Sequence, residues 1–191
     1  MQLSPIGWAL RPLKNYANFS GRASRAEFWW FFLFMFVIWM VAYFVLIGGL
    51  IGAGANQAAP SAGLIGAFGG VGILLMLFWL AMIIPSIAVQ VRRLHDTNRS
   101  GWWIGGFYLL YGLYIVLMFG SMRSMMVSQA AGTPPDPQQL MGGTFVVSMI
   151  LGLVMFVYMI ALIVFYCLAG TRGPNRYGED PYGPDVERVF A

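Results

Sequence analysis

The stretch VRRLHDTNRSGWW, residues 91–103, is a charged island in the middle of an otherwise apolar chain. It contains three arginines, one aspartate and His95, the only histidine of the protein. No Asp, Glu, Lys or Arg occurs from residue 28 through residue 91, and only two charged residues follow the island before Arg172. Two long uncharged stretches around a short charged one predict membrane helices that are joined by a loop at residues 91–103.

The composition of the chain supports the same class. Of the 191 residues, 59% are hydrophobic and only 9% are charged, whereas a soluble domain has about 25% charged residues. We therefore expect an all-α membrane protein with a single four-span domain. The net charge of +4 does not indicate nucleic-acid binding, because basic residues beside membrane spans report orientation and contact with anionic lipid.

The predicted spans cover about residues 28–50, 66–90, 102–120 and 145–169. The first has 23 residues and would be about 35 Å long as a helix, which exceeds a hydrocarbon core of roughly 30 Å. Helical wheels and loop composition then assign the rest. Residues 1–27 are an interfacial lead-in with a short helix, residues 121–142 are an outer loop, and residues 170–191 are a polar tail.

Two local signals refine this outline. Pro12 should kink the lead-in helix or open a second short one, because proline lacks the amide donor and clashes with the preceding turn. Ser24 and Glu27 have the spacing of a capping box, in which each side chain accepts from the other's backbone amide. This box predicts the start of the first long helix.

Orientation follows from the basic residues of the loops. The positive-inside rule places the side with more Lys and Arg in the cytoplasm. Only Arg123 falls in the predicted outer loop. Both termini and the island are therefore predicted to be cytoplasmic, since the other ten basic residues lie on their side: Arg11, Lys14, Arg22, Arg25, Arg92, Arg93, Arg99, Arg172, Arg176 and Arg188.

Three charged segments then share one surface: residues 21–29, 91–103 and 170–183. One interpretation is a basic surface for phosphate head groups or a protein partner, with these candidate residues: Arg22, Arg25, Glu27, Arg92, Arg93, His95, Asp96, Arg99, Trp102, Arg172, Asn175 and Arg176. The alternative, which we favour over a specific lipid site, is internal pairing. Asp96 lies at i+4 from Arg92 and at i+3 from Arg93, and further carboxylates are available at the same depth.

A catalytic interpretation centres on His95 and Asp96, since a histidine near a carboxylate is a common general base. It would make the protein a small membrane enzyme acting on a lipid-linked or phosphorylated substrate. Neighbouring residues rarely face each other, however, and no nucleophile or metal partner stands out. The single Cys167 excludes an intrachain disulfide and a cysteine-based metal cluster. We therefore predict no catalytic residues, no cofactor and no metal.

The sequence also resembles a known family. Three stretches carry the resemblance: residues 19–29 (FSGRASRAEFW), RRLHD at 92–96 with SGWW at 100–103, and Gly173 with NRYG at 175–178 and Asp180-Pro181. Their order and spacing resemble domain-of-unknown-function family 805 of bacterial inner-membrane proteins. This chain has Asn98 where the family often has glycine, and asparagine tolerates the left-handed conformation that the turn requires.

The resemblance implies a four-helix protein of the bacterial inner membrane and, by the name of the family, no assigned activity. We expect a non-enzymatic, multi-pass protein in contact with the lipid bilayer. The expected partners are anionic phospholipid head groups, a protein partner or a second copy of the chain, and no nucleic acid.

Overall fold

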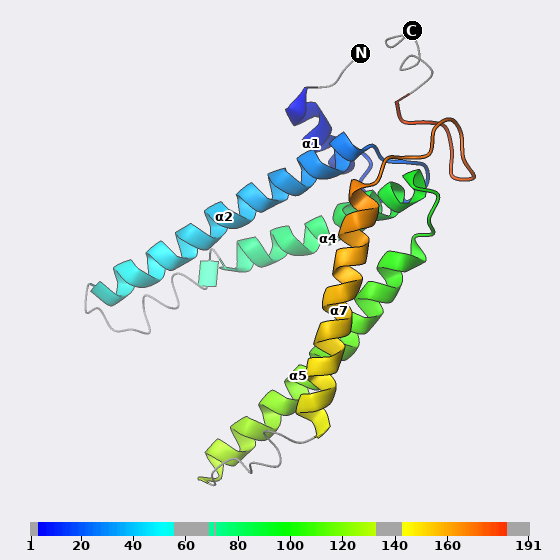
Figure 1. Ribbon diagram of the computed structural model, residues 1–191. Coiled ribbons are helices and arrows are strands. Elements are labelled where there is room, and N and C mark those ends of the chain that lie inside the picture. Colours follow the sequence, from blue (N-terminus) through cyan, green and yellow to red (C-terminus); the bar gives the residue numbers. More distant parts are fainter. Residues whose placement is uncertain (1–3, 56–68, 71, 133–142, 183–191) are drawn as a thin grey trace. The chain divides into compact units, whose positions relative to one another are not determined.

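The computed structural model describes residues 4–55, 69–70, 72–132 and 143–182, which contain five α-helices and no strand (Figure 1). A short helix, α1 (Pro5–Lys14), comes first. Four long helices follow: α2 (Arg25–Ala55), α4 (Gly72–Asp96), α5 (Trp102–Ala130) and α7 (Gly143–Cys167). Each of the four is long and apolar enough to cross a membrane. The prediction of an all-α protein with four transmembrane helices is therefore confirmed.

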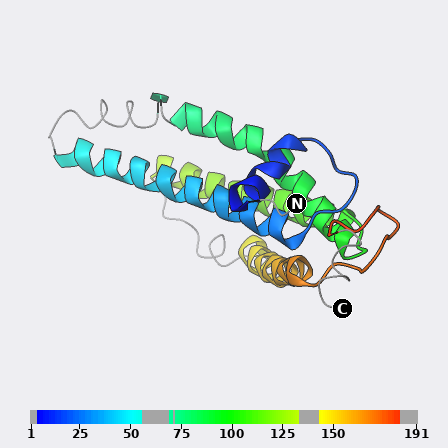
Figure 2. The same cartoon turned by 90° about the horizontal axis from the view of Figure 1, so that it is seen from above.

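The described residues form two compact units. The first contains α1, α2, α4 and the segment that begins at Ala169, and the second contains α5 and α7. Within the first unit, α1 packs against α2 and α4, and α2 runs alongside α4 (Figures 1 and 2). Within the second unit, α5 packs along α7, where the Tyr158 hydroxyl donates to the Trp103 carbonyl at 2.7 Å.

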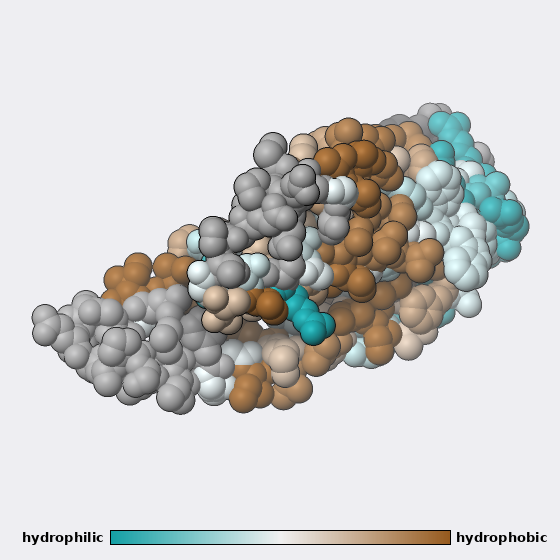
Figure 3. Space-filling view, turned by 90° about the horizontal axis from the view of Figure 1, so that it is seen from below, coloured by the Kyte–Doolittle hydropathy of each residue, from teal (hydrophilic) through white to brown (hydrophobic). Residues whose placement is uncertain are grey.

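The long helices present large apolar side chains outward. Phe44 is 62% exposed, Leu109 is 77% exposed and Leu153 is 65% exposed. Brown, hydrophobic surface accordingly covers much of the face in Figure 3. A helix that is apolar all round suits a lipid environment, because the bilayer covers the side chains that water would expose.

Buried side chains of the first unit gather at one end. Ala23 and Phe28 lie at the start of α2, and Ala88, Val89 and Leu94 lie near the end of α4. Apolar packing thus holds these two helix ends together, and the charged segments meet at the same place.

Helices extend beyond several of the predicted span ends. The second span was expected to end at residue 90, but α4 continues to Asp96, so half of the charged island is helical. The third was expected to end at residue 120, but α5 continues to Ala130 because residues 121–130 contain neither glycine nor proline. Gly132 follows with φ +66°, a conformation typical of a helix C-terminus. Residues 133–142 of the predicted loop lie outside the described residues.

The start of α2 confirms half of the predicted capping box. The Ser24 side chain accepts from the backbone amide of Glu27 at 3.1 Å. The Glu27 carboxylate does not return to Ser24 but pairs with Arg92, whose Nη1 lies 2.7 Å from Oε1. A buried cation is a stronger partner for a carboxylate than a backbone amide.

The lead-in forms one helix, so of the two predicted effects of Pro12, a kink or a second short helix, the second helix does not occur. Ser4 caps α1 by accepting from the Gly7 amide at 3.2 Å, and the helix continues past Pro12 to Lys14. Pro12 lies in the last turn, where only one helical hydrogen bond is lost, and its ring is buried. Beyond the helix, the Tyr16 hydroxyl donates to the Ala81 carbonyl of α4.

Candidate functional site

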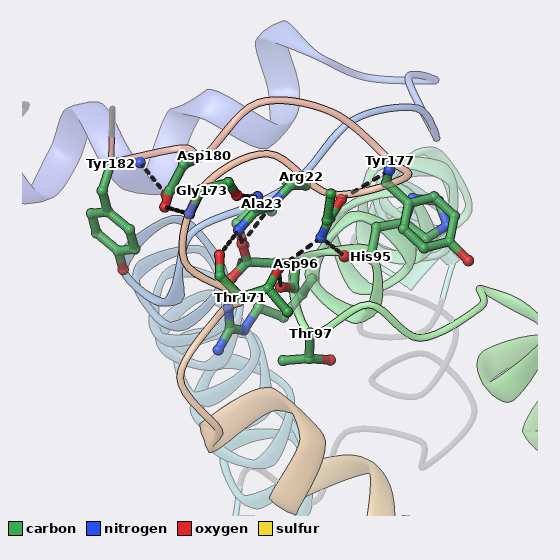
Figure 4. A network of polar contacts seen from close by, with 12 residues as sticks. Arg22, Ala23, His95, Asp96, Thr97, Thr171, Gly173, Tyr177, Asp180 and Tyr182 are labelled. Carbon is green, nitrogen blue, oxygen red and sulfur yellow. Dashed lines mark hydrogen bonds and ion pairs between the residues drawn. The ribbon is translucent and has the colours of Figure 1, made fainter. Parts of the chain in front are cut away.

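Five charged side chains are buried at the polar end of the first unit: Arg22, Glu27, Arg92, Arg93 and Asp96. We call these five residues the polar clamp. They come from the turn before α2, the first turn of α2 and the last two turns of α4. The segment after Ala169 passes over Arg22 and Asp96 (Figure 4). Burial of charge is costly unless the charges are paired and hydrogen-bonded, so the partners of each residue are decisive.

Asp96 is the centre of the polar clamp. Its Oδ1 accepts from Nε of Arg22 at 2.9 Å, and Nη2 of the same guanidinium is also 2.9 Å away. Its Oδ2 accepts from Nη1 of Arg93, one turn earlier on α4. The carboxylate is thus held by two arginines, which offsets its complete removal from solvent.

Arg22 extends this contact to the C-terminal segment. Its Nη1 donates to the Gly173 carbonyl at 2.6 Å, and its Nη2 donates to the Thr171 carbonyl at 2.5 Å. The Thr171 amide in turn donates to the backbone carbonyl of Asp96 at 2.9 Å. One planar guanidinium therefore joins three chain segments, a geometry that a lysine could not reproduce.

The last carbonyls of α4, which have no partner within the helix, are capped from outside it. Thr97 donates to the Leu94 carbonyl through both its amide and its hydroxyl, at 3.1 and 3.0 Å. The His95 carbonyl accepts from the Asn98 amide at 3.0 Å and from the Asn175 side chain at 2.9 Å. The C-terminal segment thus completes the end of α4.

Three residues have conformations or spacing that the polar clamp requires. Asn98 has φ +57° in the turn after α4, the left-handed conformation expected from the sequence. Gly173 has φ +71° where the C-terminal segment turns back over the clamp. A Cβ added to Gly170 would lie 2.7 Å from Cγ of Asp96, so this position has room only for glycine.

His95 and Asp96 face different partners (Figure 4). Nδ1 of His95 is 3.2 Å from the Gly21 carbonyl, and the imidazole stacks on the Tyr177 ring with centroids 3.8 Å apart and planes 3° from parallel. The Asp96 carboxylate is engaged by the two arginines. This arrangement does not favour an acid–base pair. Within the described residues, no group of His, Cys, Asp and Glu side chains is placed to hold a metal.

A second ion pair adjoins the first. Glu27 Oε1 is 2.7 Å from Nη1 of Arg92, and Glu27 Oε2 is 3.5 Å from Nε of Arg11 on α1. Sequence spacing correctly indicated Arg93 as a partner of Asp96, but Arg92 pairs with Glu27 instead. Arg11 was not among the candidate site residues, although its place on the polar face of the predicted lead-in helix was a signal for it.

The remaining candidates lie outside the polar clamp. Arg25, Arg172 and Arg176 are exposed, and Nη2 of Arg176 donates to the Asn98 carbonyl at 3.1 Å. Arg99 and Trp102 belong to the unit of α5 and α7, where the Arg99 guanidinium lies 4.0 Å from the centroid of the Phe165 ring. The candidate residues thus include a buried, paired group, the polar clamp, and three exposed arginines, Arg25, Arg172 and Arg176.

Comparison with known proteins identifies relatives over most of the chain. The family model "Protein of unknown function (DUF805)" matches residues 16–179. Inner membrane protein YhaH of Escherichia coli strain K12 is 31% identical over 176 residues, which are 92% of this chain and 97% of YhaH. Inner membrane protein YhaI of the same strain is 32% identical over 174 residues, 91% of this chain and 94% of YhaI. No solved structure matches. The chain therefore belongs to the DUF805 family, whose relatives YhaH and YhaI are inner membrane proteins.

Proposed function

We propose that the protein is a non-enzymatic module of the bacterial inner membrane that binds anionic phospholipid head groups at its cytoplasmic face. The division of its basic residues carries this proposal. Arg22, Arg92 and Arg93 are buried and hold the fold together, whereas a second group of basic residues in the same unit is exposed: Lys14, Arg25, Arg172 and Arg176.

The exposed group suits a membrane surface. Lys14, Arg25 and Arg172 form no ion pair with any described residue, so their charge is available to a ligand. Each basic residue near an anionic leaflet contributes about 1 kcal/mol of binding free energy. The internally paired core beneath them fixes their spacing, so little conformational entropy is lost on binding.

A cytoplasmic location of both termini is supported by charge and by connectivity. Ten of the eleven basic residues lie before or at the start of α2, between the last two turns of α4 and the start of α5, or after α7. The polar clamp joins the start of α2, the end of α4 and the segment after α7. If each long helix crosses the bilayer, these three points lie on one side, and the positive-inside rule makes that side the cytoplasm.

Lipid retention tests the binding proposal. The double variant Arg25→Gln/Arg172→Gln should bind phosphatidylglycerol about 30-fold more weakly than the wild type, because about 2 kcal/mol of electrostatic attraction is lost. Native mass spectrometry of the purified protein at low and high salt measures the retained lipid. Arg123→Gln is the matched control, since Arg123 is an exposed arginine of α5 and should have no effect.

Two outcomes would contradict the proposal. Unchanged phosphatidylglycerol retention in the folded double variant would remove the exposed arginines as a lipid site. Unchanged lipid together with the loss of a co-purifying protein would assign the same surface to a protein partner.

Reporter fusions test the orientation. A C-terminal green fluorescent protein should fluoresce in cells, and a C-terminal alkaline phosphatase should be inactive, because each folds on only one side of the inner membrane. The reverse pattern would place the polar clamp and both termini on the periplasmic side.

A further inference from the structure

One edge of the Arg92 guanidinium, formed by Nε and Nη2, makes no hydrogen bond with the other residues of the polar clamp. Its Nη1 pairs with Glu27, but Nε and Nη2 are buried and have no hydrogen-bond partner in the part of the chain that the structure describes. The residue is only 4% exposed. The Nε–H and one N–H of Nη2 point the same way and form a two-donor fork.

The charge balance of the polar clamp is also incomplete. Three buried arginines, Arg22, Arg92 and Arg93, face two buried carboxylates, those of Glu27 and Asp96. Among the described residues, buried arginines therefore outnumber buried carboxylates by one at this site. Asp96 is engaged by Arg22 and Arg93, and Glu27 is engaged by Arg92 and Arg11.

Both observations indicate the same kind of ligand. A buried donor without a partner and an uncompensated buried cation are each costly, and one anion removes both costs. The fork of a guanidinium matches two oxygens of a phosphate or a carboxylate, with two parallel hydrogen bonds. At a membrane surface, the abundant anion of this geometry is the phosphate of a phospholipid.

We propose that the Nε/Nη2 edge of Arg92 binds two oxygens of the phosphate group of an anionic phospholipid. This inference rests on the proposed lipid-binding function and makes it specific. The exposed arginines attract lipid loosely and without selection, whereas Arg92 holds one phosphate group in a defined geometry.

The position of Arg92 suits such a site. Arg92 precedes Asp96 by four residues, which is about 6 Å along α4. It therefore lies closer to the apolar part of α4 than the ion pairs of Asp96 do. Glu27 pairs both with Arg92 and with Arg11, and the Arg11 side chain is 38% exposed. The ion pairs from Arg92 through Glu27 to Arg11 thus connect the buried guanidinium to the partly exposed Arg11 on α1.

The Arg92→Lys variant tests the fork directly. Lysine keeps the positive charge for Glu27 but lacks the two-donor edge, so phosphatidylglycerol binding at high salt should weaken at least about tenfold. Arg93→Lys is the matched control, because it changes a neighbouring buried arginine that is engaged by Asp96. Native mass spectrometry at increasing salt, and the rise in melting temperature on adding phosphatidylglycerol to delipidated protein, measure binding.

The expected result is salt-resistant binding of one phosphatidylglycerol per chain by the wild type and Arg93→Lys, and its loss in Arg92→Lys. If Arg92→Lys binds as the wild type does, or if both lysine variants lose lipid equally, the assignment is overturned. The first of these outcomes would mean that the edge contacts water only. If inorganic phosphate protects the wild type and phosphatidylglycerol does not, the phosphate assignment stands and the ligand is free phosphate.

A competition experiment requires no variant and therefore remains decisive if Arg92→Lys does not fold. The wild type in high salt should retain phosphatidylglycerol in preference to diacylglycerol, which has the same acyl chains but no phosphate. Equal retention would overturn the proposal. Failure of the exposed surface is distinguishable, since Arg25→Gln/Arg172→Gln affects the salt-sensitive lipid and Arg92→Lys affects the salt-resistant lipid.

Discussion

Arg22 and Asp96 lie 74 residues apart in the sequence and are joined by a buried ion pair, with Nε of the arginine 2.9 Å from Oδ1 of the carboxylate. The arginine precedes α2 and the aspartate ends α4. Through its other two nitrogens, the same guanidinium holds the segment that follows α7. The pair therefore fixes the ends of three chain segments at one point.

Removal of Arg22 should destabilise the fold strongly. In Arg22→Ala, Asp96 keeps only Arg93, and the carbonyls of Thr171 and Gly173 lose their donors. Breaking a buried ion pair from one side costs about 3–5 kcal/mol. Reversible unfolding in mixed detergent micelles measures this loss. Arg172→Ala, at an exposed arginine, should change stability by less than about 0.5 kcal/mol. Equal stability of the two variants would show that Arg22 does not hold the fold.

Gly170 should tolerate no side chain. A Cβ at this position would lie 2.7 Å from Cγ of Asp96, and the carboxylate cannot move without losing Arg22 or Arg93. We expect Gly170→Ala to lower the stability by about 1–3 kcal/mol, as overpacking does in protein cores. Gly112→Ala is the control, because a Cβ there meets nothing within 4 Å. The same unfolding assay measures both, and a neutral Gly170→Ala would contradict the tight contact.

The spans could be predicted because length and hydropathy alone decide whether a helix can cross a bilayer. The ends were harder. Charge indicated a loop from residue 91, but α4 continues to Asp96 because its last turns pair their charges with other segments. The assumption that charged residues lie in exposed loops fails where ion pairs allow these residues to be buried. The polarity of residues 121–130 indicated a loop, but α5 continues through them to Ala130 because they contain no glycine or proline.

The residues of the polar clamp could be predicted from the sequence, but only some of their ion pairs could be. Arg93 and Asp96 are neighbours on one helix face, so their contact follows from i,i+3 spacing. The ion pair between Arg92 and Glu27 depends on how α2 packs against α4. No local sequence pattern predicts that packing. The contacts of Arg22 with backbone carbonyls have no sequence signal at all, since every residue has a carbonyl.

The turn after α4 should depend on the left-handed conformation of Asn98. With φ +57°, this residue suits asparagine or glycine, whereas a β-branched side chain is strained there by roughly 1–2 kcal/mol. Asn98→Val should therefore lower the melting temperature, and Asn98→Gly should leave it nearly unchanged. Both variants keep the backbone carbonyl that accepts from Arg176, so this contact does not confound the comparison. Equal loss in both variants would assign the effect to the asparagine side chain.

The stack of His95 on Tyr177 should hold the C-terminal segment against α4. The rings are 3.8 Å apart and nearly parallel, and such aromatic contacts contribute about 0.5–1.5 kcal/mol. In His95→Ala the segment should open about 2- to 12-fold more often, and trypsin should cleave after Arg176 faster by that factor. His95→Phe keeps a flat ring and should restore much of the protection. Cleavage after the exposed Lys14 is the internal reference and should not change. If His95→Ala leaves the ratio of the two cleavage rates unaltered, the stack does not secure the segment.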